Sequence, residues 1–356
     1  MMNKSPGRGP RSLGRALAAA AAAALAVLTM ASCSVDGADD AGADKPVIRV
    51  GYQTFPSGDL VVKNAGWLED ELPDYTIEWT KFDSGADVNT AFVAGELDFG
   101  ALGSSPVARG LSDPLRIDYK VAWILDVAGD NEALVARNGT GIAKVEDLRG
   151  RKVATAFAST AHYSLLAALD RAGLSAADVQ LIDLQPQASL AAWQRGDIDA
   201  IYTWLPTLDE VRANGTTLIT SRELADAGKP TLDLAVVAGG FAADHPDVVD
   251  VWRRAQARAL TTIADDPDAA AKAVAAEAGI TPDEAKSQLK QAVFPSPEQV
   301  ASTQWLGTDA APGALANNLH SAAQFLSDQK QIPSAPDLAD FQDALYVTGL
   351  PGAVEQ

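Results

Sequence analysis

The sequence predicts an α/β protein with two lobes, each a mainly parallel sheet flanked by helices. From Val47 on, short apolar or alternating segments typical of strands alternate with segments of helical periodicity. Two stretches, 94–106 and 195–206, also repeat one pattern: a helix that ends at a Gly, an acidic-hydrophobic-Asp run, a buried strand and a loop containing a Pro. The repeat indicates two similar lobes, each with a loop beyond the carboxyl end of a strand, where open parallel sheets bind small ligands. A plain helix stop is the alternative interpretation of each run.

The first lobe is expected over residues 46–131 and 238–356. Apolar or alternating runs predict its strands at 47–53, 75–82, 97–102 and 117–126. Helical periodicity predicts helices near 58–72, from an N-cap at Ser84 through Ala94, and after Ser104. After Phe241 the chain is Ala-rich, and prolines separate its predicted helices.

The second lobe is expected over residues 132–237. The D-L-R-G turn at 147–150 leads into a strand, and helices are predicted at 160–172, 189–195 and 207–213. Strands are predicted at 179–184, 198–202 and 232–237, the last closing this lobe. The two passages of the chain between the lobes would form a two-strand hinge.

The N-terminus predicts export and a lipid anchor. Four basic residues precede the apolar run 17–30, and Met30-Ala31-Ser32-Cys33 resembles a lipobox, so residues 1–32 are expected to be a lipoprotein signal peptide and Cys33 the lipidated residue. An ordinary signal peptide followed by an incidental Cys is the alternative. Residues 33–45 are small, acidic and polar, as in a flexible tether, and the protein is expected on the outer face of the cytoplasmic membrane.

The charge and the motif content exclude several functions. The formal net charge is −19, and loss of the four basic residues of 1–32 would make it −23, which argues against nucleic acid and against docking on anionic lipid by charge. The three histidines (162, 245 and 320) are far apart and the single Cys is Cys33, so no metal is expected. A phosphate loop, a dinucleotide-binding G-x-G-x-x-G and a G-x-S-x-G elbow are absent from the sequence, so neither a cofactor nor an enzymatic activity is predicted.

Loops rich in neutral hydrogen-bond donors are the remaining candidates for a site. Gly103-Ser104-Ser105 and Ser159-Thr160-Ala161-His162-Tyr163 each precede or open a helix, whose N-terminal N–H groups bind anions. Helix capping is the structural alternative. Acids with apolar neighbours point to a cationic group, namely Glu132, Asp233 and, at the end of a strand, Asp83. Aromatic side chains that could form walls for a cation include Tyr52 and Trp204, with core packing as the alternative.

Several segments together resemble the taurine-binding proteins of bacterial taurine ABC importers. The matching stretches are Y-Q-T (52–54), K-F-D-S-G-A (81–86), L-G-S-S-P (102–106), N-E-A-L-V (131–135), S-T-A-H-Y-S-L-L-A-A-L (159–169), L-Q-P (184–186), A-A-W-Q-R-G-D-I-D-A (191–200) and P-T-L-D (230–233). L-G-S-S-P and D-L-R-G recur in nitrate-, sulfonate- and thiamine-precursor-binding relatives and so identify only the superfamily, whereas the two longest runs look more particular to the taurine branch. Residues 55–65 depart from the pattern and the tail after Phe241 matches loosely.

This resemblance implies a type II periplasmic-binding-protein fold and a function. It implies a monomeric solute-binding protein that closes on taurine and delivers it to an ABC permease with its ATPase. Another small sulfonate or a zwitterionic amino compound is the alternative ligand, and an exported enzyme on the same fold the alternative class. Taurine joins a permanent sulfonate to an ammonium, so helix N-termini with hydroxyls suit one end and carboxylates with an aromatic wall the other. The expected ligand-binding residues are Ser104, Ser105, Ser159, Thr160 and His162 at the sulfonate side, Glu132, Asp233 and Asp83 as acids, and Tyr52, Gln53 and Trp204 around them.

Overall fold

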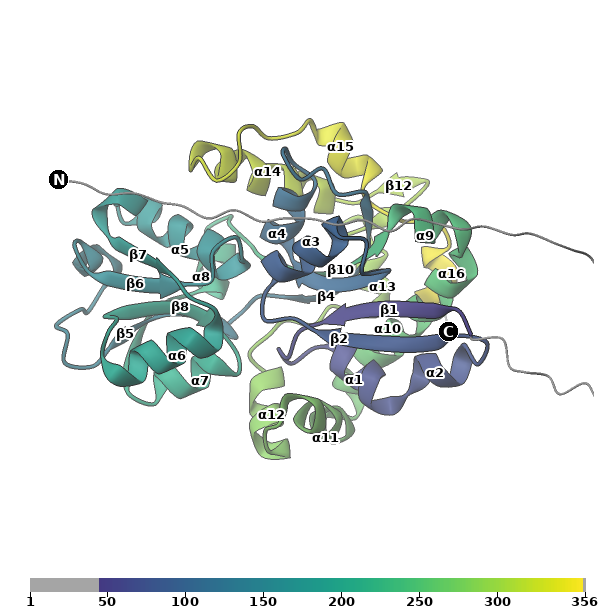
Figure 1. Ribbon diagram of the computed structural model, residues 1–356, viewed down its shortest axis with the longest axis horizontal. Helices are drawn as coiled ribbons and strands as arrows, with labels where there is room; N and C mark the ends of the chain where they lie inside the picture. The colour runs from purple at the N-terminus through teal and green to yellow at the C-terminus, as the bar shows by residue number, and fades with distance from the viewer. Residues whose placement is uncertain (1–44, 355–356) are drawn as a thin grey trace, which may run out of the picture. The chain divides into compact units, whose positions relative to one another are not determined.

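The computed structural model describes residues 45–354. These residues belong to one compact unit. The expected signal peptide 1–32, the lipidation site Cys33 and the tether as far as residue 44 lie outside the described residues. The described part holds two five-stranded sheets flanked by helices, so the α/β class with two lobes is confirmed (Figure 1).

The first sheet has the strand order β2-β1-β3-β10-β4. Its strands are β1 (Val47–Tyr52), β2 (Thr76–Lys81), β3 (Phe99–Gly103), β4 (Tyr119–Val127) and β10 (Leu232–Ala238). β1 is parallel to β2 and β3, whereas β10 is antiparallel to both of its neighbours. Four strands therefore run in one direction and only β10 opposes them, which fits the expected mainly parallel sheet.

The position of β10 corrects one expectation. The sequence pattern placed the strand at 232–237 last in the second lobe, but this strand pairs with β3 and β4 in the middle of the first sheet. The chain therefore returns to the first lobe before Leu232, not after Val237. The physical reason is that strand pairing is decided by tertiary contacts: a continuous apolar run reads the same in either sheet. Asp233 consequently faces the site from the first lobe.

The second sheet has the strand order β7-β6-β8-β5-β9. Its strands are β5 (Glu132–Arg137), β6 (Lys152–Thr155), β7 (Gln180–Asp183), β8 (Ala200–Trp204) and β9 (Gly215–Thr220). β6 is parallel to β7 and β8, and β5 is antiparallel to β8 and β9. This sheet thus repeats the plan of the first, because four strands share a direction and only β5 opposes them.

The two matching sequence patterns form equivalent structures in the two sheets. Gly95 and Gly196 both have left-handed backbones, with φ of 70° and 77°, which glycine adopts without steric cost. The chain then enters β3 in the first sheet and β8 in the second. Each strand leads into a short helix, α4 (Ser104–Gly110) or α7 (Thr207–Arg212). The repeat therefore marks the loops beyond two strand ends, as the sequence predicted.

The helices of each lobe begin and end where local sequence signals favour it. Pro occupies the first position of five helices, and Ser159, Thr220, Thr281 and Ser296 accept a backbone N–H through their side chains at helix starts. The remaining helices up to residue 226 are α1 (Gly58–Ala65), α2 (Trp67–Glu71), α3 (Gly85–Val93), α5 (Thr160–Arg171), α6 (Pro186–Arg195) and α8 (Ser221–Asp226), with 3-10 turns at Val145–Leu148 and Ala176–Asp178.

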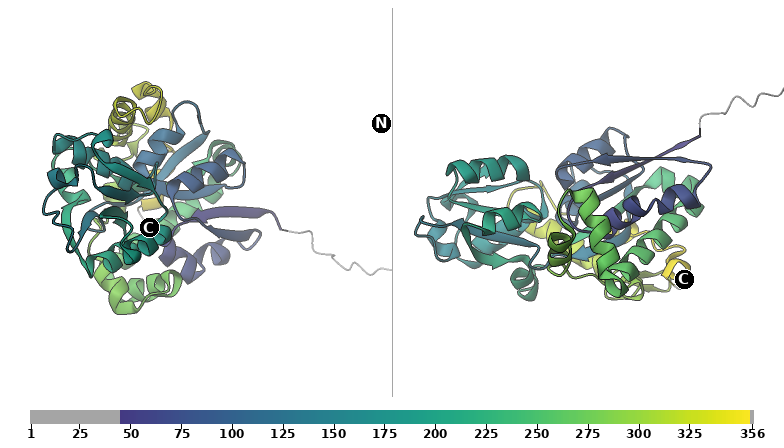
Figure 2. Two further views of the ribbon diagram at one scale, coloured as in Figure 1. Left: turned by 60° about the vertical axis from the view of Figure 1, so that its left-hand side comes forward. Right: turned by 90° about the horizontal axis from the view of Figure 1, so that it is seen from below.

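The chain after β10 is mainly helical and covers the first lobe (Figures 1 and 2). Its elements are α9 (Gly239–Asp244), α10 (Pro246–Asp265), α11 (Pro267–Ala278), α12 (Pro282–Leu289), α13 (Pro297–Val300), α14 (Leu315–Asp328), α15 (Leu338–Asp343), α16 (Leu350–Val354) and the small strand pair β11 (Gly307–Thr308) and β12 (Ala311–Pro312). Helix α10 packs on β4, and α14 packs on α4. Within residues 45–354, no helix is long and apolar enough to span a membrane.

The segment after α12 also joins the two lobes. Arg212 of α7 donates to the Gln291 side chain at 2.7 Å and to the Asp130 carbonyl at 2.8 Å. Arg222 of α8 pairs with the Asp130 carboxylate at 3.0 Å. These contacts connect the second lobe to the passage 128–131 and to the first lobe.

Candidate functional site

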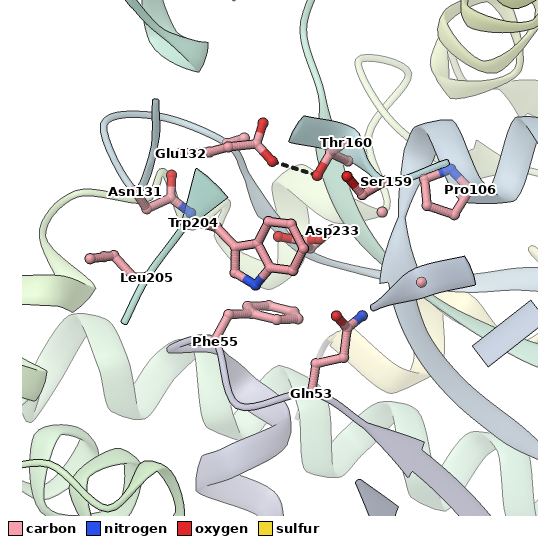
Figure 3. Close-up of a pocket in the computed structure, with 13 residues that line it drawn as sticks. Gln53, Phe55, Pro106, Asn131, Glu132, Ser159, Thr160, Trp204, Leu205 and Asp233 are labelled. Carbon is pink, nitrogen blue, oxygen red and sulfur yellow. Dashed lines mark hydrogen bonds between the residues drawn. The ribbon is translucent and has the colours of Figure 1, made fainter. Parts of the chain in front are cut away.

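A pocket lies where the strand ends of the two sheets approach each other (Figure 3). The space between its walls, open solvent at the mouth included, is about 440 Å³. Both lobes contribute to its lining, which comprises Gln53, Phe55, Gly85, Gly103, Pro106, Ala128, Asn131, Glu132, Ser159, Thr160, Trp204, Leu205 and Asp233.

The strand ends explain why these residues meet. Gln53 follows β1 directly, and Gly103 is the last residue of β3; β1 and β3 are parallel, so both residues lie at the same edge of the sheet. Asp233 reaches this edge because β10 runs the opposite way and begins there, opposite Gly103. In the second lobe Glu132 at the start of β5 pairs with Trp204 at the end of β8.

One side of the pocket is formed by helix N-termini. Gly85 begins α3 in the first lobe and Thr160 begins α5 in the second, and both residues line the pocket. The first N–H groups of a helix lack intrahelical partners and carry partial positive charge. Ser159 caps α5 by accepting the N–H of His162 at 3.1 Å, which leaves the earlier N–H groups of the helix for a ligand. This side of the pocket suits an anion.

The two lobes make a close approach beside these helices. A Cβ placed on Gly103 would lie 2.2 Å from Cγ2 of Thr160, far inside van der Waals distance. Gly103 has φ −70° and ψ 161°, a conformation that any residue adopts. A glycine is therefore required here by the neighbouring lobe and not by the backbone.

Acidic residues also line the pocket, next to these helix N-termini. Glu132 is 3% exposed, and its carboxylate accepts hydrogen bonds from Thr160 at 2.5 Å, Ser221 at 2.6 Å and Ser164 at 3.2 Å. Burial raises the pKa of Glu132, and these hydroxyl donors oppose the shift. Because its lone pairs are largely occupied, Glu132 organises the second lobe's wall and adds negative potential to the pocket.

Asp233 is the acid that is open to the pocket. Burial, with a contribution from the charge of Glu132, raises the pKa of Asp233 to about 7. Among the described residues, neither acid forms an ion pair with a Lys, Arg or His side chain. Negative charge without a protein cation beside it favours a cationic ligand group.

Aromatic and amide groups complete the lining of the pocket. In Figure 3 the Trp204 indole and the Phe55 ring lie between Gln53 and the Glu132–Thr160 pair. The Gln53 amide nitrogen donates to the Ala101 carbonyl at 2.9 Å, so its oxygen remains an acceptor. Trp204 offers a π face to a cation in the manner of aromatic ammonium sites.

Six of the eleven predicted ligand-binding residues line this pocket. They are Gln53, Glu132, Ser159, Thr160, Trp204 and Asp233. Asp83 lines an adjoining hollow that shares Gln53, Trp204 and Leu205 with the pocket. Ser104 and Ser105 are buried in α4 and do not line the pocket. The Ser104 hydroxyl accepts the N–H of Leu232 at 3.1 Å and so attaches α4 to the start of β10.

Tyr52 and His162 have partners elsewhere. Tyr52 packs edge-on against Trp79, with ring centroids 6.0 Å apart, because successive strand residues point to opposite faces and Gln53 takes the pocket side. His162 stacks on Phe157 at 4.5 Å, and its Nδ1 accepts the N–H of Ala158. Burial lowers the pKa of His162 to about 4, so the imidazole is neutral at pH 7.

Seven of the thirteen lining residues were not among the predicted ligand-binding residues, and Phe55 and Asn131 are two of them. Phe55 lies in the segment 55–65 that departs from the expected pattern, and Asn131 precedes Glu132 at the passage between the lobes. The Asn131 side-chain oxygen accepts a hydrogen bond from the N–H of Gly129 at 2.6 Å. The aromatic character of Phe55 was the available signal.

Across residues 45–354, no group of three or more His, Cys, Asp or Glu side chains is arranged to hold a metal ion.

Comparisons with known proteins agree with this architecture. The family model described as "NMT1/THI5 like" matches residues 58–270. The taurine-binding periplasmic protein of Escherichia coli (strain K12) is 35% identical over 307 residues, covering 84% of this chain and 92% of the relative. The alkanesulfonate-binding protein SsuA from Xanthomonas axonopodis pv. citri, bound to MOPS, superposes with a TM-score of 0.70 at 21% identity over 86% of this chain and 99% of the other. A desulfurization enzyme, DSZB, shares the fold with a TM-score of 0.63 at 16% identity over 87% of this chain and 99% of the other.

Proposed function

The chain belongs to the NMT1/THI5-like family, and from this premise we propose that it is an extracytoplasmic solute-binding lipoprotein that captures taurine between its lobes for an ABC importer. One observation carries the proposal: the pocket is lined by two kinds of group with opposite chemistry. Helix N-termini can bind an anion, and carboxyl groups without protein cations can bind a cation. Taurine has two opposite ends, a sulfonate and an ammonium, joined by two carbons.

In this proposal the ammonium binds at Asp233, beside Trp204 and the oxygen of Gln53. Asp233 is the natural direct partner because the Glu132 oxygens already accept hydrogen bonds from four hydroxyl groups, two of them short. The sulfonate binds at the first N–H groups of α3 and α5, beside Gly85 and Thr160. The Thr160 hydroxyl donates its one proton to Glu132, so the backbone and not this hydroxyl supplies the donors for the anion.

The acids also bear on ligand choice. A plain alkanesulfonate or nitrate carries only negative charge and would be repelled by Glu132 and Asp233. Taurine's seven heavy atoms, at about −1.5 kcal/mol each at best, set a ceiling of roughly −10 kcal/mol, or tens of nanomolar. Affinity near that ceiling needs enclosure from both lobes, as in hinge closure around a ligand.

Calorimetry of the purified protein against taurine, ethanesulfonate, sulfate, nitrate and glycine betaine tests the proposal. Taurine is expected to bind tightest and ethanesulfonate, which lacks the ammonium, much more weakly. Equal or tighter binding of ethanesulfonate would remove the ammonium site. Tighter binding of glycine betaine would assign the pocket to another zwitterion.

Asp233→Asn separates the two ends of the ligand. The variant is expected to weaken taurine by at least tenfold and to leave ethanesulfonate binding unchanged or improved, because only taurine has the positive end. Asp226→Asn, at an exposed acid that ends α8, is the matched control and should bind as the wild type does. Equal losses for taurine and ethanesulfonate in Asp233→Asn would make Asp233 a structural residue. Asp83→Asn, tested in parallel, decides whether the adjoining hollow contributes to the site.

The proposal extends to the membrane. Lipidation at Cys33 after removal of residues 1–32 would leave the monomeric binding unit on a tether at the outer face of the cytoplasmic membrane, beside a permease and its ATPase. Cys33→Ser in a bacterial host is expected to release the mature protein from the membrane fraction. Membrane retention of a Cys33→Ser protein that has lost residues 1–32 would exclude the anchor. A binding role without enzymatic activity is supported by the binding functions named for the relatives.

A further inference from the structure

A third carboxyl group lies directly behind the acidic residues of the pocket. Asp126 on β4 is opposite Asp233 on β10 in the antiparallel register, so both side chains lie on the same face of the sheet as nearest cross-strand neighbours. Asp126 is 0% exposed, whereas Asp233 is open to the pocket. The site described above makes no use of Asp126.

The surroundings of Asp126 are unusual for a buried acid. Neither carboxyl oxygen accepts a hydrogen bond from any N–H or O–H group of the described residues. The ionisable groups whose charges act on Asp126 are Asp233 and Glu132, and both are acidic. Arg253 of α10, the cation packed on β4, is engaged by the carbonyls of Ala122, Tyr346 and Thr348.

A charged Asp126 would be strongly disfavoured in this place. A buried carboxylate without donors, beside two further acids, suffers desolvation and like-charge repulsion at once. A protonated Asp126 has an O–H that can donate, and the neighbouring Asp233 can accept. Two carboxyl groups that share one proton satisfy both requirements with a single negative charge.

We propose that Asp126 holds a proton at neutral pH and donates it in a hydrogen bond to Asp233, so that Asp126 is the positioning residue of the ammonium-binding carboxylate. This inference rests on the proposed function, because it assigns Asp233 to a cationic ligand group. The bond fixes one Asp233 oxygen on β4 and directs the other toward the pocket. The pair thereby presents one negative charge, matched to one ammonium, although it contains two acids.

Infrared spectroscopy tests the protonation directly. The difference spectrum of wild type minus Asp126→Asn, recorded without ligand at neutral pH, is expected to contain the C=O stretching band of a protonated carboxylic acid. Asp59→Asn is the control, because Asp59 is a buried carboxyl outside the pocket that contributes its own band. Absence of the band from the Asp126 difference spectrum overturns the proposal.

Two substitutions at Asp126 distinguish a role as hydrogen-bond donor from a role as a charged group. Asn at 126 is neutral and can still donate to Asp233, so Asp126→Asn should bind taurine within about threefold of the wild type. Leu at 126 has a similar size and no donor, so Asp126→Leu should lose about tenfold to a hundredfold of taurine affinity, the range for a hydrogen bond to a charged group, while ethanesulfonate binding stays the same. A large taurine loss in Asp126→Asn would mean that Asp126 acts as a charge, and equal losses for both ligands in Asp126→Leu would mean a structural role.

The outcomes keep the two proposals apart. If wild-type protein prefers ethanesulfonate to taurine, the ammonium site fails, whatever the infrared result. If taurine is preferred but the difference band is missing, only the proton on Asp126 fails. The infrared measurement uses the unaltered protein on one side of the difference, so it remains decisive if Asp126→Leu does not fold.

Discussion

Replacement of Gly103 by Ala should separate ligand binding from folding. The added Cβ would lie 2.2 Å from Cγ2 of Thr160 in the opposite lobe. Carbon atoms in contact are about 3.5–4.0 Å apart, so the lobes must move apart by more than about 1 Å or Thr160 must turn. Thr160 resists turning because its hydroxyl donates to Glu132 at 2.5 Å. The backbone at Gly103 accepts Ala without strain, so the conflict lies between the lobes.

The expected size of the effect follows from overpacking. An extra methyl group in a packed contact costs about 1–3 kcal/mol, which corresponds to roughly a 5-fold to 150-fold loss of affinity. The loss should appear in ligand binding because closure is the step that brings Gly103 against Thr160. A ligand-free protein that opens at the hinge avoids the clash and should keep the thermal stability of the wild type.

Calorimetry with taurine and thermal unfolding without ligand are the assays. Gly240→Ala is the matched control, because a Cβ there meets nothing within 4 Å. Thr160→Ser removes the methyl group but keeps the hydroxyl for Glu132, so the double variant should recover most of the affinity lost in Gly103→Ala. Wild-type affinity in Gly103→Ala would refute the reasoning. So would an equal loss of stability in the ligand-free protein, because the contact would then be permanent and unrelated to closure.

Three further predictions concern charge. Below about pH 7, taurine affinity should fall with each pH unit by a factor that approaches ten. The reason is that burial raises the pKa of Asp233 to about 7, and the protonated form carries no charge for the ammonium. Calorimetry across this pH range checks the prediction, and a flat profile contradicts it. Burial also raises the pKa of Asp59 to about 7. The stability that this protonated carboxyl contributes is present below about pH 4, and about 4 kcal/mol of the free energy of unfolding is lost as the pH rises to 7. The melting temperature of wild type should therefore drop relative to that of Asp59→Asn over this range, and parallel curves would exclude the effect. Arg253→Met should lower the free energy of unfolding, measured by urea titration, by about 3 kcal/mol or more. The reason is that carbonyls such as those of Tyr346 and Thr348 lose their buried donor. A change within about 0.5 kcal/mol would show that water replaces this donor.

The sequence predicts those parts of the fold that depend on local signals. Ser159 as a helix cap, Gly95 and Gly196 as left-handed helix ends, and the prolines that open α10 to α13 all act on their immediate neighbours. These positions gave nearly correct helix starts and the order of strands and helices. The sequence analysis predicted no strand at 132–137. It also predicted neither β9 nor α8, because 215–226 has weak periodicity in either register.

The sheet membership of β10 and the choice of pocket residues depend on contacts that a single sequence does not contain. Leu232–Ala238 is apolar enough for either sheet, and only pairing with β3 and β4 places Asp233 beside Asp126. Ser104 has the chemistry of a ligand donor, yet its hydroxyl is used by the backbone of Leu232. Residue type thus predicts what a side chain can do, whereas packing decides which partner it serves.

The three buried acids of the site, Asp126, Glu132 and Asp233, indicate that ligand binding costs the protein stability. Hydrophobic residues of similar size at Asp126 would pack in the sheet without a desolvation penalty, so these acids lower the stability of the ligand-free protein. Hydroxyl donors relieve Glu132, and the proposed shared proton relieves Asp126, but nothing among the described residues supplies a cation to Asp233. A ligand ammonium removes that deficit only when it is enclosed, because the interaction strengthens as water leaves. Selectivity for a positive end and closure of the lobes would therefore arise from one arrangement of charge.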